Sequence, residues 1–123
     1  MTIPLAVSFP EVFIISSTGP AGTVQKSSMG TYLKMDEVFR FNRPVWKKEG
    51  DDLFIFFSPS GTWSVGPDTS STSPRLYNRV YDLPYPTQTN WLFRNSKNEY
   101  PLDTQVQIRG ENMKGESKNI NTT

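Results

Sequence analysis

The sequence predicts an all-β fold, either a single antiparallel β-sandwich or a small open barrel with little helix. Short runs of β-branched and aromatic residues alternate with Gly-, Pro- and Ser-rich turn signals along most of the chain. No segment keeps the apolar period of an amphipathic helix for several turns. Eight Phe, five Tyr and three Trp supply large rings that fill a core from few positions.

A chain of 123 residues is expected to form one domain. We expect an extended arm over residues 1–11, because Pro4 and Pro10 restrict its backbone, and this segment has no basic region typical of a signal peptide. The β-domain is predicted over residues 12–109, followed by a polar tail over residues 110–123. No apolar run is long enough to span a membrane.

The first half of the domain is expected to begin with a strand at Val12–Ile15, a β-branched and aromatic run. Residues 16–28 are rich in Gly, Ser, Thr and Pro and are predicted to form a loop. A second strand begins at Tyr32–Met35, and residues 35–41 fit either its continuation or one helical turn. Residues 44–48 form the next apolar stretch before a strong turn signal.

The middle of the chain predicts a hairpin. Residues 53–57 form the most hydrophobic run, which is typical of a strand covered on both faces or of one that meets a partner. Residues 58–61 are a turn closed by glycine, and residues 62–65 alternate as a half-buried strand does.

The last third contains shorter elements. Residues 66–74 are predicted to be a polar surface loop, and residues 75–81 fit a strand or a short helical turn. Two prolines make residues 82–89 irregular. Strands are expected at residues 90–94 and 106–108, where aromatic and β-branched residues return.

The expected core combines aromatic and β-branched positions of these strands. It includes Phe13, Ile15, Tyr32, Val45, Phe54, Phe56, Trp63, Val65, Trp91, Phe93, Val106 and Ile108. The other face of the run 53–57 carries Leu53, Ile55 and Phe57, which need a cover. In a two-layer domain that face is a candidate subunit interface, since large apolar patches seldom stay exposed.

The residue types present argue against catalysis. The chain has no Cys and no His, which excludes disulfides, thiolate chemistry, Ser-His-Asp triads and the usual zinc sites. Asp51 and Asp52 fit a turn better than a calcium site, and no pattern pairs two carboxylates for hydrolysis. We therefore expect no enzyme activity, no cofactor and no metal. A net charge of +1 argues against nucleic acid as a partner.

Three segments carry a resemblance. They are Asn42-Arg43-Pro44-Val45-Trp46-Lys47, Leu53–Phe57 and Gly61-Thr62-Trp63-Ser64-Val65-Gly66. Together they resemble a small aromatic-rich β-module with the pattern N-G-R-P-V-[YW]-K followed by G-x-W-x-V-G, found in secreted, often multidomain proteins of invertebrates and algae. The likeness is close over residues 30–66 and loose over residues 12–109, and Phe41-Asn42-Arg43 departs from the expected Asn-Gly-Arg turn. The resemblance implies an extracellular location and assigns no function.

The first functional hypothesis is a non-enzymatic structural or interaction protein. It self-associates into a homo-oligomer or larger assembly of an extracellular or mineral-associated matrix, with Leu53, Ile55 and Phe57 as interface candidates. The alternative is a carbohydrate-binding module of the β-sandwich type.

In that alternative, Trp46, Trp63 and Trp91 would offer ring faces to a sugar, although core packing explains the same residues. The expected partner is a glycan or an anionic or mineral surface, and lysines would contact such a surface. No membrane is expected as a partner. The candidate lysines are Lys26, Lys34, Lys47 and Lys48.

Overall fold

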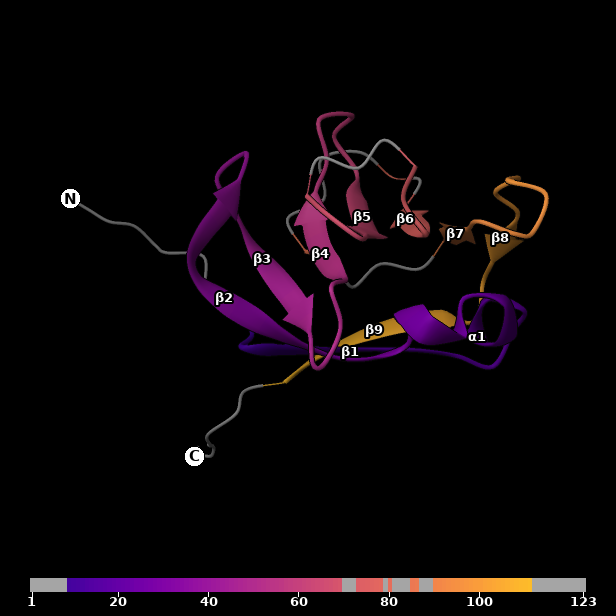
Figure 1. The fold of residues 1–123 in the computed structure, drawn as a ribbon, viewed down its shortest axis with the longest axis horizontal. Helices are drawn as coiled ribbons and strands as arrows, with labels where there is room; N and C mark the ends of the chain where they lie inside the picture. The colour runs from indigo at the N-terminus through magenta and orange to yellow at the C-terminus, as the bar shows by residue number, and fades with distance from the viewer. Residues whose placement is uncertain (1–8, 70–72, 79, 81–84, 87–89, 112–123) are drawn as a thin grey trace.

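The computed structural model describes residues 9–69, 73–78, 80, 85–86 and 90–111 (Figure 1). It confirms the all-β fold: within these residues, nine antiparallel strands form one sheet that curls into a nearly closed barrel. The strands are β1 (Val12–Ser17), β2 (Gly30–Arg40), β3 (Arg43–Lys48), β4 (Phe54–Phe57), β5 (Trp63–Gly66), β6 (Leu76–Asn78), β7 (Trp91–Phe93), β8 (Leu102–Asp103) and β9 (Val106–Glu111). Two short helices, α1 (Ala21–Val24) and η1 (Lys26–Ser28), connect β1 to β2, and neither could cross a membrane.

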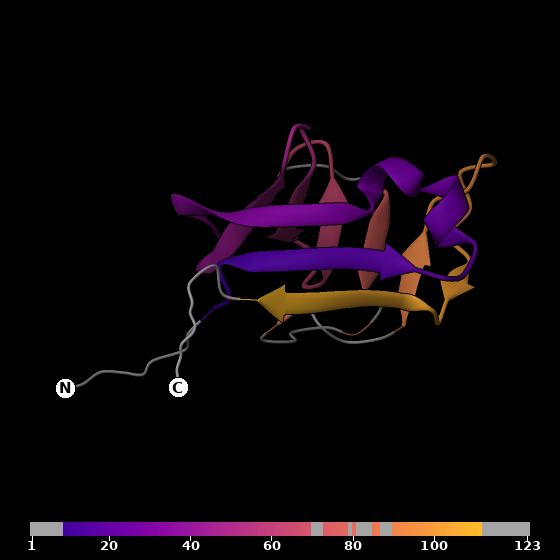
Figure 2. The same cartoon turned by 90° about the horizontal axis from the view of Figure 1, so that it is seen from below.

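The order of strands explains the curvature. Neighbours in the sheet follow the chain from β8 back to β1, and β9 then returns to pair with β1. Only Thr104 and Gln105 separate β8 from β9, although these strands lie at opposite ends of the strand order. The sheet must therefore bend round until its ends meet. Figure 2 shows the result, with β2, β1 and β9 passing across the strands behind them.

Aromatic rings form the centre of the barrel. Trp46 lies between Phe13 and Trp63, with ring centroids 4.5 Å and 6.0 Å away, and Phe57 meets Trp63 at 5.4 Å. Each large ring removes on the order of 150–250 Å² from water, so a few positions complete the core. All the predicted core residues are buried except Phe54, which is half-buried.

Strand β4 is covered on both faces by its own chain. Leu53, Ile55 and Phe57 belong to the main core cluster and are at most 4% exposed. Phe56 points to the opposite face and is 0% exposed. Leu53, Ile55 and Phe57 have the cover that they were expected to need, but it comes from their own chain. Their assignment as a candidate subunit interface is corrected, because this face is the interior of the barrel.

Several predicted boundaries change. Residues 35–40 continue β2 with an irregularity between Lys34 and Phe39, where Glu37 has a φ of 58°. Residues 76–78 form a strand, and the expected loop 16–28 contains the end of β1 and both short helices. Strand β9 reaches Glu111, beyond the expected domain end at residue 109. Most of the predicted arm 1–11, tail 110–123 and irregular segment 82–89 lies outside the described residues.

A buried carboxylate ties the two ends of the sheet together. Asp103 on β8 is 2% exposed and accepts hydrogen bonds of 2.8 Å from Ala21 N, Ser17 Oγ and Gln105 N. The donors Ser17 and Ala21 lie at the end of β1 and the start of α1. The approach is so close that a Cβ on Gly19 would lie 2.3 Å from an Asp103 oxygen.

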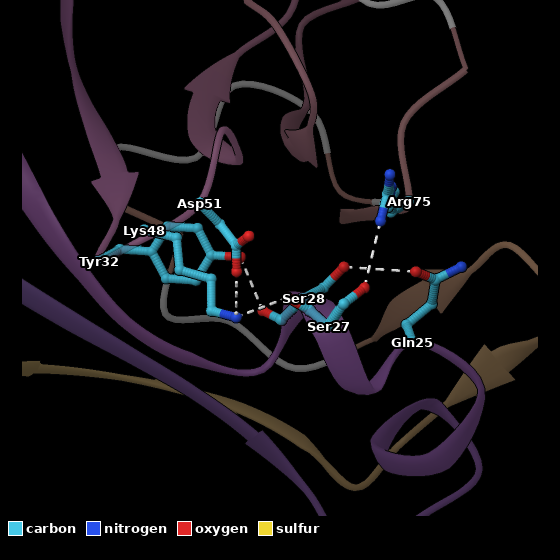
Figure 3. A network of polar contacts seen from close by, with 7 residues as sticks. All are labelled: Gln25, Ser27, Ser28, Tyr32, Lys48, Asp51 and Arg75. Carbon is cyan, nitrogen blue, oxygen red and sulfur yellow. Dashed lines mark hydrogen bonds and ion pairs between the residues drawn. The ribbon is translucent and has the colours of Figure 1, made fainter.

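Helix η1 is fixed from several strands (Figure 3). Tyr32 donates to the Ser28 carbonyl at 2.7 Å, Lys48 Nζ to the Ser27 carbonyl at 2.7 Å, and Arg75 to Ser27 Oγ at 3.2 Å. Burial raises the pKa of Tyr32 well above its ordinary value, so the phenol stays a neutral donor. Hydrogen bonds, rather than apolar burial, hold this polar segment across the opening of the barrel.

Candidate functional site

A hollow of about 400 Å³ opens where the β4–β5 turn, strand β6 and the segment before β8 meet. Its lining contains four side-chain hydroxyls of serine and threonine, two prolines and two tyrosine rings, and no charged side chain among the described residues. The lining residues are Ser58, Pro59, Ser60, Thr62, Ser64, Pro74, Tyr77 and Tyr100. We call this hollow the tyrosine pocket.

The β4–β5 turn supplies a cluster of three hydroxyls. Gly61, with a φ of 87°, lets the turn close, and its N–H donates to the Ser58 carbonyl at 3.0 Å. The Ser58 hydroxyl lies 2.8 Å from that of Ser60 and 3.1 Å from that of Thr62, and Ser60 and Thr62 are 3.2 Å apart. Each hydroxyl both donates and accepts, so the cluster can reorient toward a ligand hydroxyl.

Ser64 and Tyr77 form the floor on neighbouring strands. Trp63 and Val65 point into the core, so Ser64 between them points outward, and it lies directly opposite Tyr77 in the β5–β6 ladder. Ser64 is only 2% exposed. Neither the Ser64 nor the Tyr77 hydroxyl makes a hydrogen bond with the described part of the chain. Both groups are therefore available to a molecule in the pocket.

Tyr100 forms the facing wall. Its ring meets that of Tyr77 edge to face, with centroids 5.2 Å apart, and its hydroxyl donates to the Pro74 carbonyl at 2.6 Å. Burial raises the pKa of Tyr100 above its ordinary value, with Arg94 acting in the opposite direction. The phenol is therefore neutral at physiological pH and remains a hydrogen-bond donor to Pro74.

No carboxylate of the described residues lines this pocket. Asp51 pairs with Lys48 at 3.1 Å, Glu99 accepts from Asn95 at 3.1 Å, and Asp103 serves the barrel closure. Asp36 is exposed on β2. Across the described ranges, no three acidic side chains come close enough to hold a metal ion.

The predicted contact residues all lie in the interior. Trp46, Trp63 and Trp91 are 0% exposed, so no tryptophan platform faces solvent. The Trp46 indole N–H donates to the Pro10 carbonyl at 3.0 Å, as core packing requires. Leu53, Ile55 and Phe57 are buried beside them.

Three of the four candidate lysines have acidic partners. Lys34 lies 3.4 Å from Glu11, Lys47 lies 3.7 Å from Asp52, and Lys48 pairs with Asp51. Lys26 is exposed on η1. These charges are distributed as separate surface pairs, which are individually weak, rather than as one basic patch.

The tyrosine pocket escaped the sequence analysis for a simple reason. The alternation of residues 62–65 already places Ser64 on the outer face, but Tyr77 lies in a segment with no clear period. Tyr100 reaches the pocket only through the fold, from the segment before β8. Comparison of the chain with protein families, curated proteins and solved structures gave no match.

Proposed function

We propose that this domain is a non-enzymatic carbohydrate-binding module and that the tyrosine pocket holds one neutral sugar ring. A sugar presents hydroxyl groups at its edge and C–H groups on its faces, and the pocket offers hydroxyls beside aromatic and proline surfaces. Its volume lies within the range of about 300–1,000 Å³ for small-molecule sites. The absence of charge from the described lining favours a neutral unit at this position.

The pair of Ser64 and Tyr77 carries the proposal. The Ser64 and Tyr77 hydroxyls line the pocket and bond to no other described residue. Neither hydroxyl is among the side-chain atoms that are buried without a partner, so both are open to the hollow. A sugar hydroxyl between them would supply a donor and an acceptor at once.

Self-association, the first hypothesis from the sequence, remains a prediction. One of its supports was the apolar run 53–57, whose side chains are interior to one chain. An assembly would have to use another surface. Light scattering of the purified chain across a concentration series tests it, with a particle heavier than 14.0 kDa expected from self-association and a constant single-chain mass refuting it.

Calorimetric titration with a panel of neutral mono- and oligosaccharides tests the sugar site. Calorimetry is preferable to tryptophan emission, because all three indoles lie away from the pocket surface. Ser64→Ala and Tyr77→Phe each remove one hydroxyl and should weaken binding roughly two- to tenfold. Ser16→Ala, an exposed position on β1, should leave affinity unchanged. Absence of binding to every sugar, or unchanged affinity in both pocket variants, would rule out this site.

A further inference from the structure

The tip of the β2–β3 hairpin is strained. The last paired residues are Arg40 and Arg43, and the two-residue loop between them is Phe41-Asn42. Both loop residues have positive φ, 51° at Phe41 and 63° at Asn42. Two-residue hairpin turns of this kind favour Asn-Gly, because most side chains resist the left-handed region. A bulky Phe at the first position therefore lowers the stability of the fold, and its own packing does not offset this loss.

The same Phe is exposed. Phe41 is 51% exposed, and Phe39, two residues before it on β2, is 61% exposed. Strained backbone and exposed aromatic rings are both unfavourable for an isolated domain, and both recur where a protein contacts a ligand.

The charges of the tip point to an anion. Arg40 and Arg43 lie directly opposite each other in the ladder, an arrangement in which like charges repel. Arg43 is engaged: its guanidinium carbon lies 3.6 Å from the centroid of the Phe57 ring, and Nη1 donates to the Phe41 carbonyl at 3.1 Å.

Arg40, by contrast, forms no ion pair or side-chain hydrogen bond with the described part of the chain. Its guanidinium lies 5.4 Å from the centroid of the Phe41 ring, and its Nε is buried without a hydrogen-bond partner. Its two Nη groups are not among the buried unpartnered atoms, so they are open to the surface. An anionic group at the tip would pair with these Nη groups and offset the repulsion between Arg40 and Arg43.

The tip contacts the strand that leads into the tyrosine pocket. Arg43 stacks on Phe57, and the next residue after Phe57 is Ser58 of the pocket lining. Figure 1 shows the β2–β3 hairpin and the β4–β5 turn projecting from the same side of the molecule. A ligand that extends beyond the pocket on this side would reach the hairpin tip.

We propose that the hairpin tip is a second subsite, which binds the sulfate or carboxylate of an acidic polysaccharide. Arg40 meets the anion, and the exposed Phe41 ring packs on the apolar face of the adjoining sugar. The inference rests on the proposed function, because the neighbouring neutral unit of the same polysaccharide occupies the tyrosine pocket. The pocket alone selects a neutral sugar, whereas the tip selects a longer chain that carries negative charge.

The test is calorimetric titration of the full chain with three hexasaccharides: a galactan sulfated on alternate units, the same galactan after removal of its sulfates, and a hexasaccharide that alternates galacturonate with neutral galactose. We expect an anionic form to bind about tenfold more tightly than the desulfated form, as a charge-assisted hydrogen bond implies. The preference should shrink as salt is added. Comparison of the sulfated galactan with the galacturonate identifies which anion the tip takes.

Two variants separate the subsite from general charge. Arg40→Gln should abolish the preference for the anionic forms. Arg109→Gln removes the same charge from β9, where Arg109 pairs with Glu111, and should preserve the preference. Equal losses in both variants would overturn the proposal in favour of non-specific attraction.

A third variant separates binding from folding. Phe41→Asn places a residue that accepts positive φ in the turn, so it should raise the melting temperature by a few degrees, up to about 8 °C, while weakening the anionic hexasaccharides. Lower stability together with unchanged affinity would assign Phe41 a structural role instead and overturn its part in the subsite. Equal binding of all three hexasaccharides refutes this inference alone, whereas failure of these three and of the whole panel of neutral sugars refutes the proposed function as well.

Discussion

Replacement of Asp103 by alanine should open the closure of the barrel. The carboxylate accepts three hydrogen bonds of 2.8 Å, and the one from Ala21 N is fully buried. A hydrogen bond to a charged group contributes roughly 1.5–3 kcal/mol, and a buried donor left without a partner costs about 1–3 kcal/mol. Water would reach the two partly buried donors and recover part of the loss. We therefore expect Asp103→Ala to lower the free energy of unfolding by about 3–5 kcal/mol, out of the roughly 5–15 kcal/mol typical of a domain.

Urea unfolding followed by circular dichroism measures this loss. Asp103→Asn keeps the size of the side chain but turns an NH₂ group toward backbone and hydroxyl donors, so it should lose a comparable amount. Asp36→Asn, an exposed position on β2, should change stability by less than about 0.5 kcal/mol. If Asp103→Ala also stays within about 1 kcal/mol of the wild type, the sheet ends are held by something other than this carboxylate.

Three further predictions follow from buried positions. The pKa of Tyr32 is raised in the folded state, so the folded protein keeps a proton that the unfolded chain loses above pH of about 10. The stability contributed by this proton should be fully present below that pH and fall above it. Thermal melts from neutral to strongly alkaline pH should show a shallower decline of melting temperature in Tyr32→Phe than in the wild type. A wild-type melting temperature that is constant across this range would contradict a raised pKa of Tyr32. Gly19→Ala should cost about 1–3 kcal/mol in urea unfolding, because its Cβ would lie 2.3 Å from an Asp103 oxygen. Gly50→Asn should cost little, because nothing lies within 4 Å of its Cβ and Asn tolerates the φ of 78° at this position. Equal effects of the two substitutions would disprove the close approach at Gly19. Ile55→Ala should lower the free energy of unfolding by about 2–5 kcal/mol. The loss should be the same at low and high protein concentration, because Ile55 packs within one chain. A loss that grows on dilution would indicate an intermolecular contact instead.

The run at residues 53–57 shows what an apolar pattern does and does not determine. Five consecutive apolar residues predicted either a strand covered on both faces or one that meets a partner, and β4 is the first of these, with Phe54 half-buried. They could not determine which face is the interior, because alternation assigns faces only when one set is polar. The barrel encloses Leu53, Ile55 and Phe57, so these residues do not form the candidate subunit interface.

The closure of the barrel could not be predicted for a different reason. Asp103 and Ala21 are 82 residues apart, and their contact depends on β9 returning to pair with β1. The segment around Ala21 is rich in Gly, Ser and Thr, a composition typical of loops. Its order comes from hydrogen bonds supplied by distant strands, which leave no local pattern in the sequence.

The tyrosine pocket was predictable in part. The hydroxyls of Ser58, Ser60 and Thr62 belong to one turn that the sequence indicates clearly, and strand alternation directs Ser64 outward. Tyr100 joins them only because the segment before β8 folds against β6. A site assembled from distant segments can be predicted only when the topology is known. Here the sequence did not decide whether residues 75–81 form a strand or a helical turn.

The groups behind the two proposals differ in kind. The Ser64 and Tyr77 hydroxyls line the tyrosine pocket and are not among the buried atoms without a partner, so leaving them open to solvent costs the fold little. Arg40 Nε is buried without a partner, and so is Arg75 Nε, whose guanidinium bonds to Ser27 on η1. Buried unsatisfied nitrogens therefore occur both at the hairpin tip and beside η1. The case for a ligand rests on the pocket lining and on the exposed tip, which Ser64→Ala and Arg40→Gln test separately.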